Sequence, residues 1–275
     1  MTKALKAENF ERFATGSDVR GSSAVSLNEI DAALPYDPIT LARKSLEFES
    51  ATPQEILRYV FDTYPNTAVS TAFGLEGCAL IDMAVRIKPD VPVFTIDTDY
   101  LFAETLALKD LLVARYKLNL KILKPQLTIA EQEKQHGAKL YESNPDLCCA
   151  IRKVEPNRRA IAGLDAWIAG LRRDQTAARA KTDILERFDH DDGRPYVKVN
   201  PLAGWTRQKV WDYVLDKGVP YNELLDRGYK SIGCWPCTRP VAEAENERAG
   251  RWAGRGKTEC GIHTFALKRG YGDVS

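Results

Sequence analysis

The chain has 275 residues, of which 44% are hydrophobic and 28% are charged, and its formal net charge is +1. This length and composition are sufficient to bury a core in one or two domains, while the near-neutral charge argues against the broad basic surface of a nucleic-acid-binding protein, so we expect no nucleic-acid partner. No segment approaches the roughly 18 apolar residues of a membrane span, and the first residues lack an apolar signal stretch. We therefore expect a soluble cytoplasmic protein without a membrane partner.

The N-terminal part of the chain gives little structural signal. Residues 1–35 lack hydrophobic periodicity and are predicted to form an N-terminal extension. Order is predicted to begin with a helix from Thr52 to about Tyr64, because Thr52, Pro53 and Glu55 supply an N-cap, a first-turn proline and a capping box. We assign residues 36–240 to one α/β domain and residues 241–275 to a C-terminal segment.

Strands and helices then alternate along the chain. The hydrophobic pattern predicts strands over residues 67–73, 91–96 and 118–123, with helices over 76–87 and 101–116 between them. Shorter strands are predicted over 166–169 and 196–199, followed by a helix over 206–216 that is closed by Gly218 and Pro220. This alternation predicts an α/β fold with a doubly wound, mainly parallel sheet.

Two loops follow predicted strands at the edge of the sheet where such folds bind ligands. The first runs from Ser70 through Gly74 to Gly77, and its small residues and helix start are suited to cradling a phosphate with backbone N–H groups. The second begins with Asp97 and Thr98. Neither loop matches a standard nucleotide-binding motif, so each alone is a weak signal, and a strand-to-helix turn with glycine is more often purely structural.

Four of the six cysteines form two close pairs. Cys148 and Cys149 are adjacent, and Cys234 and Cys237 form a C-W-P-C motif. Structural zinc and iron–sulfur clusters both accept four cysteines, but adjacent cysteines favour a 4Fe-4S cluster because they can bind different irons. Separately, the first pair is also compatible with two buried small residues and the second with a redox-active or zinc-binding pair. Cys78 lies in a helical apolar pattern and is predicted to be a core residue.

Cys260 lies in a basic, glycine-rich segment. Arg248 and Arg251 precede it and His263 follows it. Positive charge lowers the pKa of a thiol and enriches the nucleophilic thiolate, and the same charges would hold an anionic substrate. The sequence therefore predicts a catalytic cysteine, although an idle cysteine in a solvated basic tail is the simpler alternative.

These motifs together resemble a known family. The Cys148-Cys149 pair followed by Lys153, the segment 233–238 around the second pair, and the segment 259–263 around Cys260 resemble assimilatory adenylylsulfate reductases, the iron–sulfur branch of the sulfonucleotide reductases. The resemblance covers residues 52–263. It implies an adenine nucleotide α-hydrolase-like fold related to the ATP pyrophosphatases, with the loop from Ser70 in place of the phosphate loop, and one 4Fe-4S cluster.

The resemblance also implies a reaction. A cysteine matching Cys260 attacks the sulfur of adenosine 5'-phosphosulfate (APS), AMP leaves, and an enzyme S-sulfocysteine remains. Thioredoxin or a glutaredoxin-like dithiol then releases sulfite. The sequence leaves a homo-oligomer open.

Further residues take substrate roles by the same resemblance. Lys153, Arg248, Arg251 and His263 match positions around the phosphosulfate, where positive charge offsets the repulsion between a thiolate and an anionic substrate. Arg172 and Arg173 match a second substrate segment of the family. Asp97 and Thr98 match its nucleotide loop. The chain departs from the family at Asp99, where glycine is common.

Two other functions stay open at this point. The first is the same reaction on 3'-phosphoadenosine 5'-phosphosulfate (PAPS), which cluster-free relatives generally prefer. The second is a non-catalytic binding module that carries zinc or a cluster and captures a partner with its basic tail. The binding module predicts that Cys260→Ser keeps function, whereas both enzymes predict its loss.

Overall fold

A six-stranded sheet organises the computed structural model, which describes residues 35–263. The strand order is β3-β2-β1-β4-β6-β5, and all neighbours are parallel except the β5–β6 pair at one edge. The strands are β1 (Thr67–Ser70), β2 (Pro92–Ile96), β3 (Asn119–Leu123), β4 (Ala166–Ile168), β5 (Leu185–Asp189) and β6 (Pro195–Val199). The order reverses between β1 and β4, which confirms the predicted doubly wound, mainly parallel sheet.

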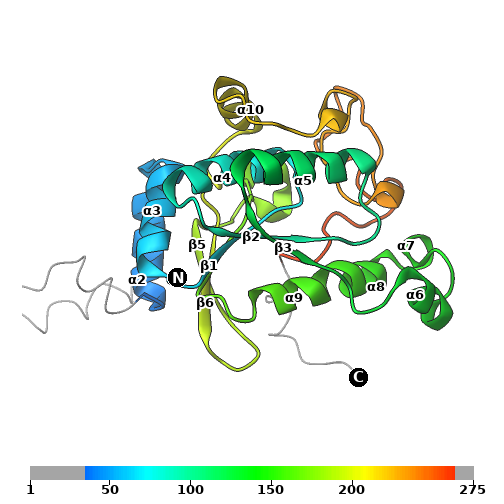
Figure 1. Ribbon diagram of the computed structural model, residues 1–275, viewed down its shortest axis with the longest axis horizontal. Coiled ribbons are helices and arrows are strands. Elements are labelled where there is room, and N and C mark those ends of the chain that lie inside the picture. Colours follow the sequence, from blue (N-terminus) through cyan, green and yellow to red (C-terminus); the bar gives the residue numbers. More distant parts are fainter. Residues whose placement is uncertain (1–34, 264–275) are drawn as a thin grey trace, which may run out of the picture. The chain divides into compact units, whose positions relative to one another are not determined.

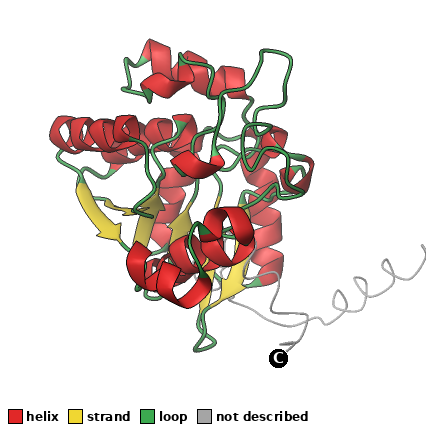
Figure 2. Cartoon of the chain, turned by 90° about the vertical axis from the view of Figure 1, so that its right-hand side faces the viewer, coloured by secondary structure: helices red, strands yellow, loops and turns green. Residues whose placement is uncertain are grey.

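Helices cover both faces of the sheet. Figure 1 shows α4 and α5 on one face and α9 on the other, and Figure 2 shows the same layers after a quarter turn. The helices are α2 (Pro38–Glu47), α3 (Pro53–Thr63), α4 (Leu75–Ile87), α5 (Ala103–Tyr116), α6 (Ile129–His136), α7 (Leu140–Ser143), α8 (Pro145–Cys149), α9 (Glu155–Ile161) and α10 (Arg207–Asp216). None of the helices between residues 35 and 263 combines the length and apolarity needed to cross a bilayer.

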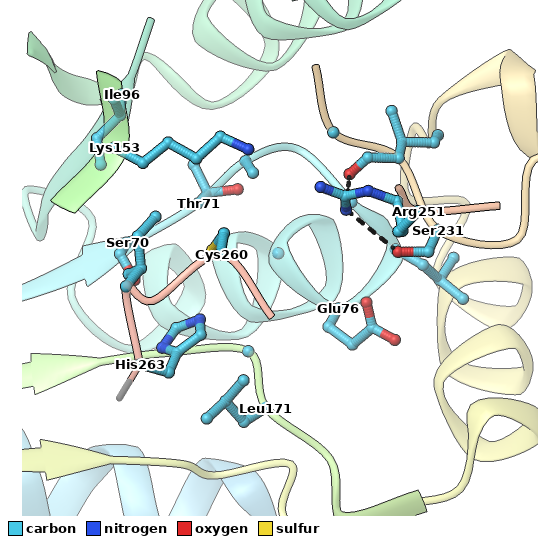
Figure 3. Close-up of a pocket in the computed structure, with 18 of the residues that line it drawn as sticks. Ser70, Thr71, Glu76, Ile96, Lys153, Leu171, Ser231, Arg251, Cys260 and His263 are labelled. Atoms are coloured by element: carbon cyan, nitrogen blue, oxygen red, sulfur yellow. Dashed lines mark hydrogen bonds between the residues drawn. The ribbon is translucent and has the colours of Figure 1, made fainter. Parts of the chain in front are cut away.

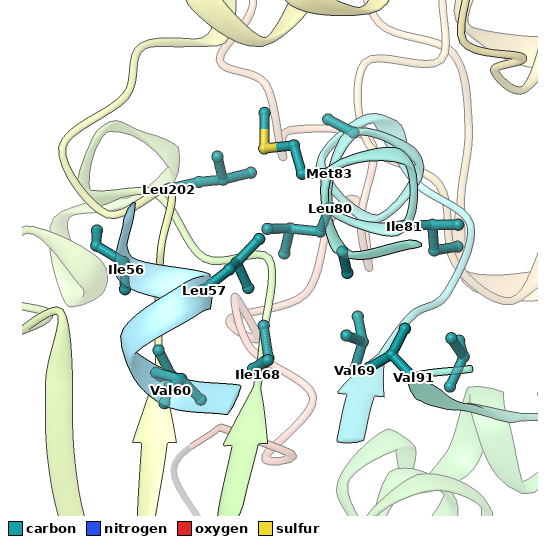
Figure 4. Packing of buried hydrophobic residues seen from close by; sticks show 14 of the residues in the cluster. Ile56, Leu57, Val60, Val69, Leu80, Ile81, Met83, Val91, Ile168 and Leu202 are labelled. Carbon is teal, nitrogen blue, oxygen red and sulfur yellow. The ribbon is translucent and has the colours of Figure 1, made fainter. Parts of the chain in front are cut away.

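The core explains why the strand sequences are apolar on both sides. Alternate strand residues face opposite layers, so Val69 and Ile168 pack against α3 and α4 while Trp167 joins a second cluster near α9. Figure 4 shows the first layer, where Leu57 and Leu80 meet the sheet. Full burial of each such side chain contributes about 1.5–3 kcal/mol.

The predicted elements agree with the structure at most positions. The capping box of α3 is present, since the Thr52 hydroxyl accepts from the Glu55 N–H at 3.3 Å and the Glu55 carboxylate accepts from the Thr52 N–H at 2.7 Å. Cys78 is fully buried in α4, as predicted. The first strand is shorter than predicted because the chain turns at Phe73, which has a φ of 55°.

Several elements were not predicted. They are α2, β5 and the short helices α6–α9. The predicted N-terminal extension, up to residue 34, and the end of the predicted C-terminal segment, from residue 264, lie outside the described residues.

Candidate active site

A cavity of about 220 Å³ lies beyond the carboxyl ends of β1, β2 and β4. This is the switch point of the sheet, where ligands of doubly wound folds bind. The wall combines the loop after β1, the end of β2, one face of the α9 region, and three later segments around residues 170–179, 230–234 and 247–263. Residues nearly 200 positions apart in sequence therefore meet in one site (Figure 3).

The loop after β1 presents backbone to the cavity. Ser70, Thr71 and Gly74 line it, and α4 begins directly afterwards, so the positive end of the helix dipole faces the space. A Cβ at Gly77 would lie 2.4 Å from the Thr71 hydroxyl, so only glycine allows this close return of the chain. The Ser70 hydroxyl donates to the Ile168 carbonyl at 3.1 Å and thereby fastens the loop to β4.

Three cations line the cavity around the ring of Trp252. Arg251 lies 4.7 Å, Lys153 5.8 Å and Arg248 6.0 Å from the ring centroid. Lys153 and Arg251 are buried, and neither forms an ion pair with a carboxylate in residues 35–263. Within the described part of the chain Arg251 donates only to neutral groups, the Ser231 hydroxyl and the Ile232 carbonyl, and buried charges without a counter-ion are costly, so this arrangement favours an anionic ligand.

Buried polar atoms without a hydrogen-bond partner mark the same space. Five such atoms within the described residues belong to side chains that line the cavity, and each would regain a partner from a polar ligand. They are Thr95 Oγ1, Asn157 Nδ2, Arg248 Nε, Arg251 Nε and His263 Nδ1. Thr95 and Asn157 are not among the site residues predicted from the sequence. The available signal was that Asn157 follows Lys153 by one helical turn.

Cys260 reaches the cavity as a thiol that ionises readily. Burial alone would raise its pKa, but Lys153, the Ile262 N–H, Arg251 and Arg248 outweigh burial and hold the pKa below the usual 9.0. In Figure 3 the Cys260 side chain lies between Lys153 and His263, facing the centre of the cavity. The structure thus brings the predicted nucleophile and the predicted cations together.

His263 differs from the other members of this group because it is not a cation. Its ring stacks on Trp167 at 5.5 Å with an interplanar angle of 12°. Burial, followed by the charges of Lys198, Arg179 and Arg248, lowers the pKa of His263 well below 6.5. The lowered pKa favours a neutral, hydrogen-bonding His263 near pH 7, so the positive charge expected at this position comes from Lys153, Arg248 and Arg251.

The four paired cysteines surround a second, smaller cavity. Cys148, Cys149, Cys234 and Cys237 all line it as free thiols, and no carboxylate or imidazole of the described residues joins them. Burial, followed by the neighbouring thiols, raises the pKa of Cys148 to about 12. Within residues 35–263 no three His, Cys, Asp or Glu side chains converge on a single metal ion. Four thiols spread around one space fit a multi-iron cluster, which needs one sulfur per iron.

The two cavities share a wall. Lys153 and Cys234 line both, and the Thr98 hydroxyl, which also faces the larger cavity, lies 3.2 Å from Cys234 Sγ. The cysteine pair that ends α8 is joined to Lys153 by a π-helical segment, Ala150–Val154. Such π-helical turns commonly occur at functional sites because they re-aim side chains.

Comparisons with known proteins agree with this site. Residues 66–240 match the family model of the phosphoadenosine phosphosulfate reductase domain. The chain belongs to this family. It is 42% identical over 243 residues to a phosphoadenosine 5'-phosphosulfate reductase of Gloeobacter violaceus, covering 87% of this chain and 100% of the relative. It is 44% identical over 218 residues to an adenosine 5'-phosphosulfate reductase of Oceanobacillus iheyensis, covering 78% and 90%.

A solved structure of the reductase family has the same fold. The phosphoadenylyl-sulfate reductase of Candida auris, crystallised with phosphate, superposes with a TM-score of 0.65 at 36% identity, covering 74% of this chain and 98% of that chain. The adenine nucleotide α-hydrolase-like fold implied by the sequence is therefore confirmed.

Two arginines expected at the substrate of this reductase-family member do not line the cavity. Arg172 is fully buried, with ion pairs to Glu76 and, at 2.5 Å, to Glu247. Arg173 pairs with Glu49 at 2.6 Å and donates to the Thr182 carbonyl. Both guanidinium groups hold distant segments together, so the structure gives them positions behind the wall of the site.

The loop that begins at Asp97 follows β2, as expected for the nucleotide loop of the family, but the Asp97 side chain does not reach the cavity. Asp97 does not line the cavity; its carboxylate accepts from the Asp99 N–H at 3.0 Å and pairs with Lys124 at 3.4 Å. Asp99 has a φ of 59°, a conformation that explains why glycine is common here. Its carboxylate pairs with the buried Arg152, which also donates to the Thr98 carbonyl at 2.6 Å.

Proposed function

We propose that the protein is an oxidoreductase that converts adenosine 5'-phosphosulfate to sulfite and AMP in assimilatory sulfate reduction in the cytoplasm. The observation that carries this proposal is the pair of buried cations Lys153 and Arg251, which have no carboxylate partner among residues 35–263, beside the ionisable thiol of Cys260. An anionic substrate with an electrophilic atom satisfies both features at once.

The reaction balances with residues of the cavity and one external dithiol. The Cys260 thiolate attacks the sulfur of the substrate, the bond from sulfur to the phosphate oxygen breaks, and AMP leaves with the electron pair. Lys153, Arg248 and Arg251 offset the negative charge that gathers on the phosphate. One thiol of a thioredoxin or glutaredoxin-like dithiol then attacks Cys260 Sγ, and sulfite leaves with the electron pair of the S–S bond. The second thiol of the dithiol breaks the resulting mixed disulfide, so Cys260 is regenerated and the dithiol, having supplied two electrons, becomes a disulfide.

The other cavity-lining residues have binding roles in this proposal. The loop from Ser70 to Gly74 and the start of α4 receive phosphate oxygens. Neutral His263, Thr98 and the two residues missed in the sequence, Thr95 and Asn157, hydrogen-bond the nucleotide.

We further propose that Cys148, Cys149, Cys234 and Cys237 hold one 4Fe-4S cluster. When bound, the cluster would supply a fixed charge next to Lys153 and a link between two distant segments. Iron and sulfide content with visible absorption of anaerobically purified protein tests this assignment. A colourless protein containing one zinc would refute it.

The substrate test compares the two nucleotides directly. We expect a preference for APS over PAPS in steady-state competition, because the four cysteines match the branch of the resemblance that reduces APS. The name of the Gloeobacter violaceus relative keeps PAPS as the second candidate. A higher kcat/KM for PAPS would favour this candidate.

The enzyme test is Cys260→Ser. We expect loss of sulfite release with unchanged iron content, since Cys260 does not line the cysteine cavity. Sulfite release at the wild-type rate would instead support a non-catalytic binding module.

A further inference from the structure

The residue before Cys260 is held by an ion pair between distant segments. The Glu259 carboxylate accepts from Arg179 Nε at 2.9 Å and from Arg179 Nη2 at 2.6 Å, a two-point pair. The Thr176 hydroxyl donates to the same carboxylate at 3.3 Å, and Arg248 Nη2 lies 3.4 Å from it. Only 11% of the Arg179 side chain and 16% of the Glu259 side chain are exposed, so water competes weakly for this contact.

Arg179 lines the cavity, but its guanidinium is already occupied. Its Nε and Nη2 groups donate to the Glu259 carboxylate, and its Nη1 group donates to the Gln175 side-chain oxygen at 2.5 Å. Arg248 is different, because Nη2 contacts Glu259 and the Thr258 carbonyl while Nε has no partner. The two arginines therefore have different roles: Arg179 fixes the segment that contains Glu259, and Arg248 retains one N–H donor for a ligand.

Glu259 acts as a charged anchor and has no proton to donate. Burial would raise its pKa, but hydrogen bonding to Arg179 and the charges of Arg179 and Arg248 outweigh burial and lower the pKa. On the other side of Cys260, Gly261 turns the chain with a φ of 91°, and Ile262 packs against the cluster around Trp167. The segment is thus fixed on both sides of the thiol.

We propose that Glu259 is a positioning residue: its ion pair with Arg179 docks the segment that carries Cys260 so that the thiol points into the cavity. This inference rests on the proposed function, in which Cys260 is the nucleophile. One peptide bond separates the two residues, so loss of the anchor displaces the thiol directly. A misplacement of about 1 Å at a reacting atom costs on the order of 10²-fold in rate.

The test uses the full-length, cluster-containing protein and three variants. Glu259→Gln keeps the size of the side chain and removes its charge, while Glu259→Asp keeps the charge on a shorter arm. Glu245→Gln is the matched control, because Glu245 belongs to the same C-terminal region and pairs with Arg239 at 2.8 Å without lining the cavity. Three quantities are measured: single-turnover formation of the sulfo adduct on Cys260, the Kd of AMP, and the rate at which iodoacetamide alkylates Cys260 without nucleotide, with the site identified by mass spectrometry.

For Glu259→Gln we expect adduct formation to fall about 10²-fold while the Kd of AMP changes less than about three-fold, because Lys153 and Arg251 form no ion pair with Glu259 and Arg248 loses only a 3.4 Å contact with it. Alkylation of Cys260 rises several-fold, because the undocked thiol is more accessible. Glu259→Asp gives a smaller change with the same split between rate and affinity, and Glu245→Gln behaves as wild type.

Two outcomes overturn the inference. Wild-type adduct formation and alkylation in Glu259→Gln exclude a positioning role, and a loss of AMP affinity as large as the loss of rate assigns Glu259 to ligand binding instead. If Glu259→Gln does not fold, the same criteria apply to Glu259→Asp. Failure of the proposed function is a separate result, because it appears as sulfite release by Cys260→Ser.

Discussion

The Arg251 guanidinium occupies space that is open only because residue 233 is a glycine. Adding one methyl group at Gly233 therefore tests the position of Arg251. A Cβ at Gly233 would lie 2.2 Å from Arg251 Nη2, 2.4 Å from Cζ and 2.8 Å from Nη1. Ordinary contact begins at 3.4 Å, so in Gly233→Ala the guanidinium must retreat by 1.2 Å (3.4 − 2.2). The backbone at Gly233 has no left-handed φ, so the effect comes from this contact rather than from backbone strain.

The displaced guanidinium leaves its position beside the Trp252 ring. Arg251 is 8% exposed, and its guanidinium lies 4.7 Å from the Trp252 ring. A shift of about 1 Å in a group that stabilises developing charge corresponds to about 10²-fold in rate, or about 2.7 kcal/mol. We therefore expect Gly233→Ala to lower kcat/KM for APS by about 10²-fold with a small change in melting temperature.

The assay follows sulfite release at equal iron content, because Gly233 adjoins the cysteine-bearing segment. Gly256→Ala is the control: it adds a methyl group in the same C-terminal region, where no atom lies within 4 Å of the new Cβ. A Gly233→Ala protein with full iron content and kcat/KM within about three-fold of wild type would show that Arg251 contributes little to transition-state binding.

Three further predictions concern stability. The pKa of His263 is lowered in the folded protein, so the folded state takes up a proton less readily than the unfolded state. The contribution of His263 to the free energy of unfolding is therefore present above pH 6.5 and is lost as the pH falls below that value. The melting temperature of His263→Gln should therefore fall less than that of wild type between about pH 7 and about pH 5, and equal slopes would contradict this reasoning. Asp99→Gly keeps the left-handed backbone but leaves the buried Arg152 without its carboxylate, so urea unfolding should show a loss of about 3 kcal/mol; an unchanged free energy of unfolding would mean that the pair is dispensable. Leu80→Ala empties a fully buried position in α4 and should cost about 2–5 kcal/mol with kcat/KM per folded molecule preserved, whereas Leu215→Ala, at a position 62% exposed, should cost less than about 0.5 kcal/mol; similar losses in both variants would refute the assignment of the core.

The central parallel strands β1, β2, β4 and β6 were predictable because they are mostly buried. A strand such as Pro92–Ile96 reads as a short apolar run between helices, which is a strong local signal. β5 gave no such signal, since it is an edge strand with alternating exposure and the sequence LERFD. Helices α6–α9 span only four to eight residues each, too few turns for a clear hydrophobic period.

The convergence of the four paired cysteines on one cavity was predictable from another signal, the short spacing within each pair that is visible in the sequence. The end of β1 was not predictable from the sequence, because it depends on Thr71. The Thr71 hydroxyl accepts from the Phe73 N–H at 2.9 Å and turns the chain. Serine and threonine hydroxyls make such local bonds in competition with strand pairing. Asn157 was also missed, since a buried amide is informative only once its lack of a partner is known.

The roles of the basic residues could not be sorted from sequence, because their carboxylate partners are remote. Arg172 meets Glu76 across 96 positions, Arg179 meets Glu259 across 80, and Arg173 meets Glu49 across 124. In the sequence these arginines look no different from Arg248 and Arg251.

In the fold, the buried basic residues fall into two groups according to whether they have a carboxylate partner. A buried cation with its own carboxylate is already neutralised and holds structure, whereas Lys153 and Arg251, buried and without a carboxylate in residues 35–263, retain charge for a ligand. The same criterion divides roles around the nucleophile, where Arg179 is satisfied by Glu259 and Arg248 keeps one free nitrogen. The absence of a carboxylate partner among residues 35–263, more than the local density of arginine, therefore marks where the proposed substrate anion would bind.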